Sequence, residues 1–146
     1  MSVPKILLVE DDLLSSKVLS YKLSARGYQV HTAYNAREAA EITLMANPHL
    51  VILDLNLSAP DSSPGKQPGG LGYLEWLNEN VVTNRPEVIV VSALSPIKAA
   101  IMTRKLGAIA FLQKPADDRL FAMIDILFGK QFVPKQPRAN PPSLTP

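Results

Sequence analysis

Four short apolar runs, at residues 6–9, 50–53, 88–91 and 109–112, constrain the fold of this chain more than any other feature. Apolar runs of this length are typical of strands that are buried on both faces of a parallel sheet. A fifth segment, residues 28–33, alternates apolar and polar residues, which is typical of a less covered strand. The sequence therefore predicts five strands, with residues 28–33 at an edge of the sheet.

Segments with helical periodicity separate the predicted strands. In the first of them, Leu14, Val18, Tyr21 and Ala25 recur at spacings of four, three and four residues. This is the spacing of one apolar helix face, and Gly27 follows it at a position where helices often end. The pattern therefore predicts an amphipathic helix over this segment.

The other predicted helices are marked by capping residues or by apolar spacing. Asn35, with Glu38 three residues later, resembles a capping box for a helix over residues 36–46. Ser95-Pro96 provides an N-cap and a first-turn proline for a helix to about Leu106. The remaining two helices are marked by Leu71, Leu74, Leu77 and Val81 and, after Asp117 or Asp118, by Leu120, Ile124 and Leu127.

The alternation of five strands with five helices predicts an α/β fold of the flavodoxin-like, doubly wound (βα)5 type. Right-handed crossovers favour a five-stranded parallel sheet of order 2-1-3-4-5 with helices on both faces. In that order the first and third strands are neighbours, and a crevice opens at their carboxyl ends. We expect any ligand to bind there.

The length of 146 residues predicts one domain, which we assign to residues 1–129. Residues 130–146 lack periodicity and are rich in proline, so we expect a disordered tail or a linker. This tail carries Lys130, Lys135 and Arg138 and no acid, whereas the whole chain has a net charge of only +2. The rest of the chain therefore shows no basic concentration, and we expect no direct contact with nucleic acid.

Composition excludes several other classes of protein. The chain has no cysteine, which excludes disulfides, cysteine-ligated zinc, iron–sulfur clusters and thiol catalysis. The first apolar run is too short for the core of a signal peptide, and no run approaches the length of a membrane helix. We therefore expect a cytoplasmic protein with no membrane contact.

Polar residues follow four of the predicted strands directly. Glu10 and Asp11 follow the first strand, Asp54 the third, Ser92 the fourth and Lys114 the fifth. Because the carboxyl ends of parallel strands meet at one edge of the sheet, these side chains are expected to lie together. Each residue alone would be an ordinary turn or cap residue, but the match at four strand ends favours a functional site.

The residue types in this cluster suit a phosphoryl group on a carboxylate. Clustered carboxylates repel one another unless a cation lies among them, and oxygen ligands suit Mg²⁺. Asp54 would be the nucleophile, and Lys114 and the Ser92 hydroxyl would bind the phosphoryl oxygens. Asp12 is expected to be the N-cap of the first helix rather than a metal ligand.

Four segments resemble the receiver domain of two-component response regulators. They are Ile-Leu-Leu-Val-Glu-Asp-Asp at 6–12, Val-Ile-Leu-Asp-Leu-Asn-Leu at 51–57, Val-Val-Ser-Ala at 90–93 and Phe-Leu-Gln-Lys-Pro at 111–115. The resemblance covers roughly residues 4–129. It implies a signalling domain that catalyses only its own phosphorylation and dephosphorylation, and that is not otherwise an enzyme.

The resemblance also implies a role for each matching residue. Asp54 would accept a phosphoryl group from a histidine kinase or a phosphotransfer protein, and a protein interaction surface would then switch. That surface, formed by the fourth helix, fifth strand and fifth helix, would bind a downstream protein or a second copy. The other implied roles are Mg²⁺ binding by Glu10, Asp11, Asp54 and the backbone carbonyl of Asn56, phosphate contact by Lys114, a switch hydroxyl in Ser92, and a switch aromatic in Phe111, with Lys114–Pro115 as a cis peptide.

The chain departs from the family pattern after Asp54. Ser58 stands where receivers usually have proline, and the glycine that opens the third helix is matched only by Gly70. The loop over residues 58–70 is thus longer than usual, and we favour a tolerated surface loop. The alternative is that it covers Asp54 or selects a partner, with its prolines on Tyr73 and Trp76, a helix face directed away from Leu74 and Leu77.

Other functions remain open on the same fold. A receiver-like interaction module whose output ignores phosphate would not need the complete set of site residues. A flavodoxin should have a hydroxyl-rich loop after the first strand, where this chain has Glu10, Asp11 and Asp12. An aspartate-dependent phosphatase would prefer a second aspartate at position 56, where this chain has Asn56.

Overall fold

The computed structural model describes residues 3–57, 67–93 and 96–129, in which five strands alternate with five helices. The predicted cap Ser95, most of the loop over residues 58–70, and the tail over residues 130–146 lie outside these residues. In chain order the elements are β1 (Lys5–Val9), α1 (Leu13–Ala25), β2 (Gln29–Ala33), α2 (Ala36–Ala46), β3 (Leu50–Leu53), α3 (Gly69–Asn80), β4 (Glu87–Ser92), α4 (Pro96–Lys105), β5 (Ala110–Gln113) and α5 (Asp117–Phe128).

The five strands form one parallel sheet in the order β2-β1-β3-β4-β5, which confirms the predicted topology. Val9 at the end of β1 lies opposite Leu53 at the end of β3, and Ser92 lies opposite Gln113 where β4 and β5 end. The residues that follow these strands therefore leave the sheet at the same edge. Strand β2, predicted as an edge strand, pairs only with β1 in this sheet.

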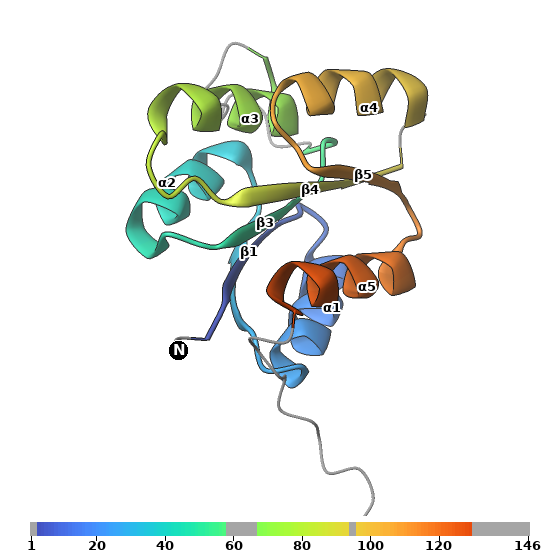
Figure 1. Cartoon of the computed structure of the whole chain (residues 1–146). Helices are drawn as coiled ribbons and strands as arrows, with labels where there is room; N and C mark the ends of the chain where they lie inside the picture. The colour runs from blue at the N-terminus through green and yellow to red at the C-terminus, as the bar shows by residue number, and fades with distance from the viewer. Residues whose placement is uncertain (1–2, 58–66, 94–95, 130–146) are drawn as a thin grey trace, which may run out of the picture.

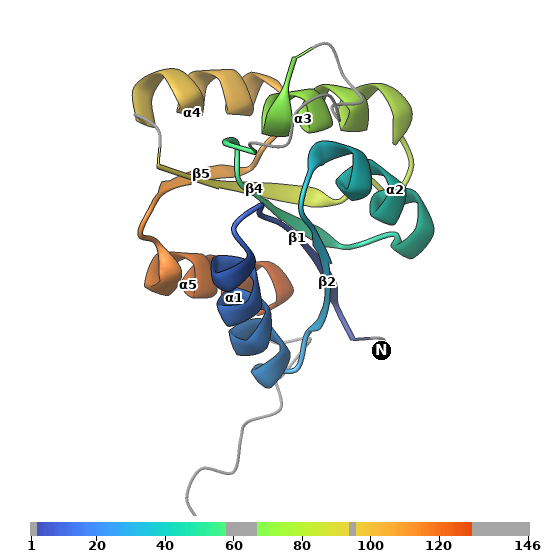
Figure 2. The ribbon, with the colours of Figure 1, turned by 180° about the vertical axis from the view of Figure 1, so that it is seen from behind.

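Helices cover both faces of the sheet. Figure 1 shows α2, α3 and α4 on one face and α1 and α5 on the other, and Figure 2 shows the same layers from behind. Alternate residues of the central strands serve the two layers. Leu7 and Val9 belong to the core beneath α2, α3 and α4, whereas Ile6 and Leu8 belong to the core beneath α1 and α5.

Side chains cap the first two helices as the sequence predicts. The Asp12 carboxylate accepts a hydrogen bond from the Ser15 backbone N–H at 2.8 Å. The Asn35 side chain likewise accepts from the Glu38 N–H at 2.8 Å, and the Glu38 carboxylate returns to the N–H of Tyr34. The Asp12 carboxylate therefore serves as the N-cap of α1. Helix α5, in contrast, begins at Asp117 without a side-chain cap.

The orientation of α1 differs from the usual placement of an amphipathic helix. Its predicted apolar face points outward, with Leu14, Val18 and Tyr21 at 71%, 46% and 76% exposure. The buried positions of this helix are Ser16 and Leu23. The apolar spacing thus predicts the helix correctly, but an apolar face normally turns toward the core, and here it does not.

The prediction that Tyr73 and Trp76 form a face of α3 directed away from Leu74 and Leu77 is wrong, and Trp76 is partly buried against the core cluster that contains these two leucines. Tyr73 is fully buried in the same core cluster as Leu74 and Leu77, so it does not point away from them. Its hydroxyl lies 2.8 Å from Thr43 Oγ1, which itself donates to the Ala39 carbonyl of α2. Because the threonine proton is used in that bond, we infer that Tyr73 donates to Thr43. Burial raises the pKa of Tyr73 to about 12, so the phenol remains a donor at neutral pH.

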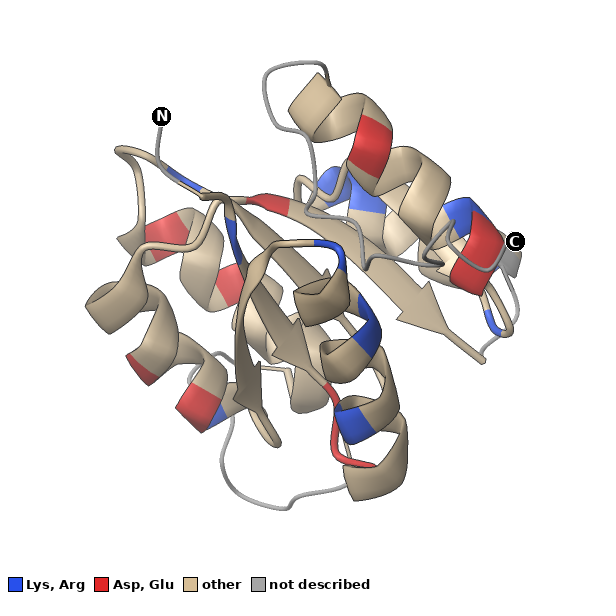
Figure 3. Ribbon diagram, turned by 90° about the horizontal axis from the view of Figure 1, so that it is seen from below, with Lys and Arg blue, Asp and Glu red and all other residues tan. Residues whose placement is uncertain are grey.

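Two further properties of the described residues are the character of their helices and the distribution of their basic side chains. No helix in residues 3–57, 67–93 and 96–129 combines the length and the apolar character that a membrane crossing requires. Lys and Arg residues are distributed over several elements (Figure 3).

Tyr73→Phe tests the bond between α3 and α2. Removing the hydroxyl should lower the free energy of unfolding by about 0.5–1.5 kcal/mol, since Thr43 keeps its bond to Ala39. Urea unfolding measures this change. Tyr21→Phe, at an exposed site, is the matched control and should be neutral. Equal midpoints for the two variants would show that the buried bond adds nothing.

Candidate functional site

Asp54 is fixed in place by the backbone on both sides of it. Its N–H donates to the Val9 carbonyl at 3.0 Å, which continues the pairing of β3 with β1 beyond the last paired residues. Its Oδ1 accepts a hydrogen bond from the Asn56 N–H at 3.0 Å. The carboxylate is buried at the carboxyl edge of the sheet. The position and the orientation of Asp54 are therefore both set by main-chain contacts.

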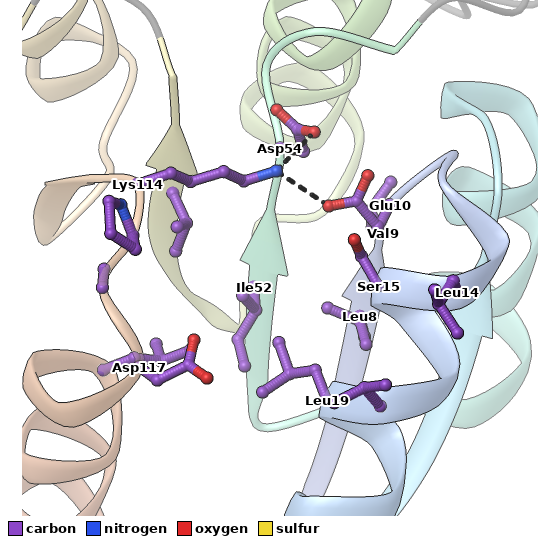
Figure 4. Close-up of a pocket in the computed structure, with 15 residues that line it drawn as sticks. Leu8, Val9, Glu10, Leu14, Ser15, Leu19, Ile52, Asp54, Lys114 and Asp117 are labelled. Carbon is purple, nitrogen blue, oxygen red and sulfur yellow. Dashed lines mark hydrogen bonds and ion pairs between the residues drawn. The ribbon is translucent and has the colours of Figure 1, made fainter.

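Lys114 joins the two buried carboxylates of the site. Its Nζ lies 2.9 Å from Glu10 Oε1 and 3.1 Å from Asp54 Oδ2, as the dashed lines in Figure 4 show. Its backbone N–H donates to the Ser92 carbonyl at 2.9 Å, and the Lys114–Pro115 peptide is cis. The lysine thus connects the ends of β1, β3, β4 and β5.

Three carboxylates gather beside Lys114. Oxygen atoms of Glu10, Asp11 and Asp54 all lie within 4.8 Å of one another. Glu10 Oε2 also accepts a hydrogen bond from the Asp12 N–H at 3.1 Å, which holds the loop after β1 against the site. Three hard oxygen donors at this separation fit a small divalent cation such as Mg²⁺.

Burial and charge shift the pKa values of this cluster. Burial raises the pKa of Glu10, and the charge of Asp54 adds to the rise, against the opposing hydrogen bond from Lys114. Burial acts to lower the pKa of Lys114, but its hydrogen bond to Glu10 and the charge of Asp54 outweigh that effect and raise it. Lys114 therefore remains a cation, and one ammonium group faces three carboxyl groups.

The remaining predicted residues lie around this cluster. Ser92 is buried at the end of β4, and its carbonyl binds the Lys114 backbone. Phe111 on β5 is partly buried against the core beneath α4. Asn56 contributes its N–H to Asp54 and follows it in the loop after β3. The structure brings Glu10, Asp11, Asp54 and Lys114 into one cluster, whereas Ser92 adjoins it through the backbone.

Two glycines that support Asp54 were only partly recognised from the sequence. Helix α3 begins at Gly69, one residue before the predicted start, and Gly69 has a φ of +64°. A Cβ on Gly70 would lie 2.7 Å from the Asp54 carbonyl oxygen and 2.8 Å from Leu55 Cα. Two adjacent glycines at a helix start, where glycine weakens a helix, are the sequence signal for such a close approach. They let α3 pack directly on the loop that carries Asp54.

An apolar cavity of about 580 Å³ opens beside the acidic cluster. It lies between α1 and α5, and Glu10, Asp54 and Lys114 line one end of it (Figure 4). Leu8, Ile52 and Leu120 are among its apolar lining residues. The site is therefore continuous with a space on the α1 and α5 face of the sheet.

Comparison with known protein families identifies the family that has this fold and this site. The family model described as "Response regulator receiver domain" matches residues 6–125, which include every element from β1 to most of α5. The chain belongs to the response regulator receiver domain family. It is thus a receiver domain of the two-component signalling type, as the sequence motifs predict. Receiver domains of response regulators accept phosphate from histidine kinases.

Relatives of this receiver domain include both single-domain and longer proteins. It is 28% identical to "Probable chemotaxis protein CheY" of Rhizobium etli, over 86% of this chain and 92% of the relative. It is 32% identical to "Probable transcriptional regulator ycf27" of Cyanophora paradoxa, over 76% of this chain but 42% of the relative. The receiver domain therefore spans less than half the length of some of the relatives that it matches.

Solved structures share the fold. A receiver domain from Bermanella marisrubri is 29% identical with a TM-score of 0.73, and the match covers 88% of this chain and all of the other. A CheY-like receiver domain from Methanospirillum hungatei is 24% identical with a TM-score of 0.72, over 86% of this chain and 94% of the other. At that lower identity the likeness supports the fold alone.

Gly70→Ala tests the contact between α3 and the Asp54 loop. Alanine favours helix formation by about 1 kcal/mol over glycine. The close approach to Asp54 and Leu55 should instead destabilise the protein by about 1–3 kcal/mol and shift the amide signals of residues 54–57. Urea unfolding and amide NMR spectra measure both effects. Glu79→Ala, at an exposed position of the same helix, should leave those signals unchanged. A stabilised Gly70→Ala protein with an unshifted loop would contradict the packing argument.

Proposed function

We propose that Asp54 of this receiver domain accepts a phosphoryl group from the phosphohistidine of a histidine kinase or of a phosphotransfer protein. The observation that carries the proposal is the setting of the Asp54 carboxylate. It lies between a backbone N–H and the Lys114 ammonium, beside two further carboxylates that could hold a cation. Donors placed around one carboxylate in this way suit the charge of a phosphoryl group more than they suit a structural aspartate.

The phosphoryl transfer involves only the phosphohistidine and the Asp54 carboxylate as reactants, and no oxidant. A carboxylate oxygen of Asp54 forms a bond to phosphorus while the phosphorus–nitrogen bond of the phosphohistidine breaks. The electron pair of that bond remains on the imidazole nitrogen, and the proton on the other ring nitrogen makes the departing imidazole neutral. The product is an acyl phosphate on Asp54 and a free histidine. Lys114 neutralises charge on the phosphoryl oxygens, and the Asn56 N–H holds the carboxylate in orientation during the attack.

Glu10, Asp11 and Asp54 are the residues that would hold Mg²⁺, with the backbone carbonyl of Asn56 as a further ligand. When bound, the ion would supply positive charge for the oxygens of the transferring group. The excess of carboxylates over ammonium groups supports a site for a cation. The same residues would support removal of the phosphoryl group by water, so the domain would act on its own aspartate and on no other substrate.

The switch would pass from the site to a surface on α4, β5 and α5. Ser92 and Phe111 lie on the adjacent strands β4 and β5, and we assign them the roles of switch hydroxyl and switch aromatic. Phe111 has no hydroxyl, so its position is read through packing alone. The outer side of this region carries exposed isoleucines, which suit a downstream protein or a second copy in the cytoplasm: Ile97, Ile101, Ile109 and Ile126.

The rival functions receive less support from the same residues. An interaction module whose output does not depend on phosphate would not need a lysine held between two buried carboxylates. A flavodoxin would bind its anionic cofactor at the loop where this chain places Glu10 and Asp11. A phosphatase acting on other molecules would need a second acid where Asn56 lies.

Asp54→Asn should abolish phosphorylation. Wild-type protein incubated with Mg²⁺ and acetyl phosphate should gain one acid-labile phosphoryl group, measured by intact mass, and the variant should gain none. Asp12→Asn is the matched control, because it changes a neighbouring carboxylate that caps α1, and asparagine caps equally well. It should retain phosphorylation. A wild-type protein that binds Mg²⁺ but takes up neither phosphoryl groups nor beryllofluoride would refute the proposed function.

Asp11→Asn should weaken Mg²⁺ binding. Loss of one ligand charge should reduce the affinity by roughly tenfold or more, which is about 1.4 kcal/mol. Titration calorimetry with Mg²⁺ alone measures the change without phosphorylation. Asp118→Asn, on the exposed first turn of α5, should leave the affinity unchanged. Equal affinities for wild type and Asp11→Asn would exclude Asp11 as a ligand.

A further inference from the structure

Two side chains hold the carboxyl-terminal end of α4 against α3. Arg85, in the loop between α3 and β4, donates from Nη2 to the Leu106 carbonyl at 3.2 Å and to Asn78 Oδ1 at 2.7 Å. Asn78, in the last turn of α3, donates from Nδ2 to the same Leu106 carbonyl at 2.8 Å. Leu106 directly follows the last residue of α4. We call Arg85, Asn78 and the Leu106 carbonyl the α4 clamp.

The Leu106 carbonyl is an acceptor that has no partner within the helix. The last carbonyls of a helix are left open in this way, and neighbouring groups must bind them. The Gly107 N–H donates to the Arg104 carbonyl at 3.0 Å, which satisfies one carbonyl of the last turn. The two side-chain donors of the clamp bind the Leu106 carbonyl, and the guanidinium adds positive charge where the helix dipole favours it.

Gly107 leaves room for the guanidinium of the clamp. Its φ is +94°, a left-handed conformation that glycine adopts without steric cost. A Cβ at this position would lie 2.8 Å from Arg85 Nη2 and 3.5 Å from Asn78 Oδ1. The clamp therefore depends on a glycine that turns the chain after α4 and also lets the arginine approach the backbone.

The rest of α4 is held less firmly than this end. Among the described side chains of α4, those of Ala99 and Thr103 are the buried ones, and both are small. Ile97 and Ile101 are 75% and 54% exposed. Helix α3, on the same face of the sheet (Figure 1), buries three large side chains: Tyr73, Leu74 and Leu77. A helix with few buried apolar contacts separates from the core at a low cost in free energy, so α4 is the more easily displaced of the two.

The two ends of α4 lie near different parts of the molecule. The amino-terminal end follows β4, which ends at Ser92 beside the acidic cluster. The carboxyl-terminal end precedes β5 and lies toward the opposite edge of the parallel sheet, where the clamp is. The end of α4 nearer to Asp54 is thus the end that the clamp does not hold.

We propose that the α4 clamp is a pivot. Helix α4 separates from the sheet at its amino-terminal end, while Arg85 and Asn78 hold its carboxyl-terminal end on α3. This motion changes the positions of Ile97 and Ile101 and leaves Leu106 in place. The pivot belongs to the unphosphorylated chain, and it rests on the proposed function only in that phosphorylation of Asp54 would be the event that uses it.

Amide hydrogen exchange tests the pivot without phosphorylation. In the wild type, the amides of residues 106–108 should be protected roughly tenfold more strongly than those of residues 100–102, although helix ends usually fray first. Arg85→Ala should reduce the protection at residues 106–108 by roughly tenfold, as expected for loss of a hydrogen bond from a charged group. Amide NMR spectra measure both effects. Equal protection of the two segments in the wild type would overturn the proposal.

Further variants separate the clamp from charge and from global stability. Arg104→Ala removes an exposed arginine of the last turn of α4 outside the clamp and should leave residues 106–108 protected. Asn78→Ala removes the other donor and should act in the same direction as Arg85→Ala. Equal losses in the two arginine variants would contradict the pivot, since charge alone would then hold the helix end. So would an equal acceleration of the β1 amides in Arg85→Ala, because the arginine would then stabilise the whole fold.

Beryllofluoride with Mg²⁺ tests the connection of the pivot to Asp54. In the wild type it should shift the amide signals of residues 97–101 more than those of residues 104–108, and in Arg85→Ala it should shift both segments similarly. Equal shifts along α4 in a wild-type protein that responds at residues 55–57 would overturn the pivot. No response at residues 55–57 would instead contradict the proposed function, and the exchange measurements would still decide the pivot.

Discussion

The arrangement of this receiver domain depends on one ammonium group placed between two buried carboxylates. Lys114 lies within ion-pair distance of Glu10 and Asp54, which come from neighbouring strands at the switch point of the sheet. Without the lysine, the carboxylates of Glu10 and Asp54 would place two negative charges together at a buried edge of the sheet. Removing one member of a buried ion pair costs more free energy of folding than the intact pair contributes. The parallel sheet makes this placement possible because all five strands present their carboxyl ends to one edge.

Much of this arrangement could be predicted from the sequence because it follows from local rules. Apolar runs define the buried strands, and the residue that follows each strand is fixed at the sheet edge by the topology. For that reason Glu10, Asp11, Asp54 and Lys114 could be brought together from their positions in the chain. The N-caps Asp12 and Asn35 were equally local, since each binds a backbone N–H three residues later.

The parts that sequence reasoning missed depend on contacts between distant elements. Apolar spacing in α1 establishes a helix, but the side that faces the sheet depends on how the loop from β1 enters it, and Ser16 and Leu23 turned inward. Tyr73 has a polar tip, which suits an exposed face, yet Thr43 on another helix accepts its proton and permits full burial. The closeness of Gly70 to Asp54 likewise depends on the packing of α3 on the loop after β3.

Contacts between distant elements reach the functional cluster at the start of α3 and at Lys114. The two contacts differ in how firmly they hold Asp54. The Gly69–Gly70 start of α3 fixes the backbone around Asp54, so the carboxylate cannot shift without moving a helix. Lys114, in contrast, reaches Asp54 through a long side chain, while its backbone N–H binds the Ser92 carbonyl. A new negative charge on Asp54 would therefore act on the lysine before it acts on α3. Lys114 follows β5 and its backbone binds Ser92 at the end of β4, so the part of the site that such a charge meets first belongs to these two strands and not to α3.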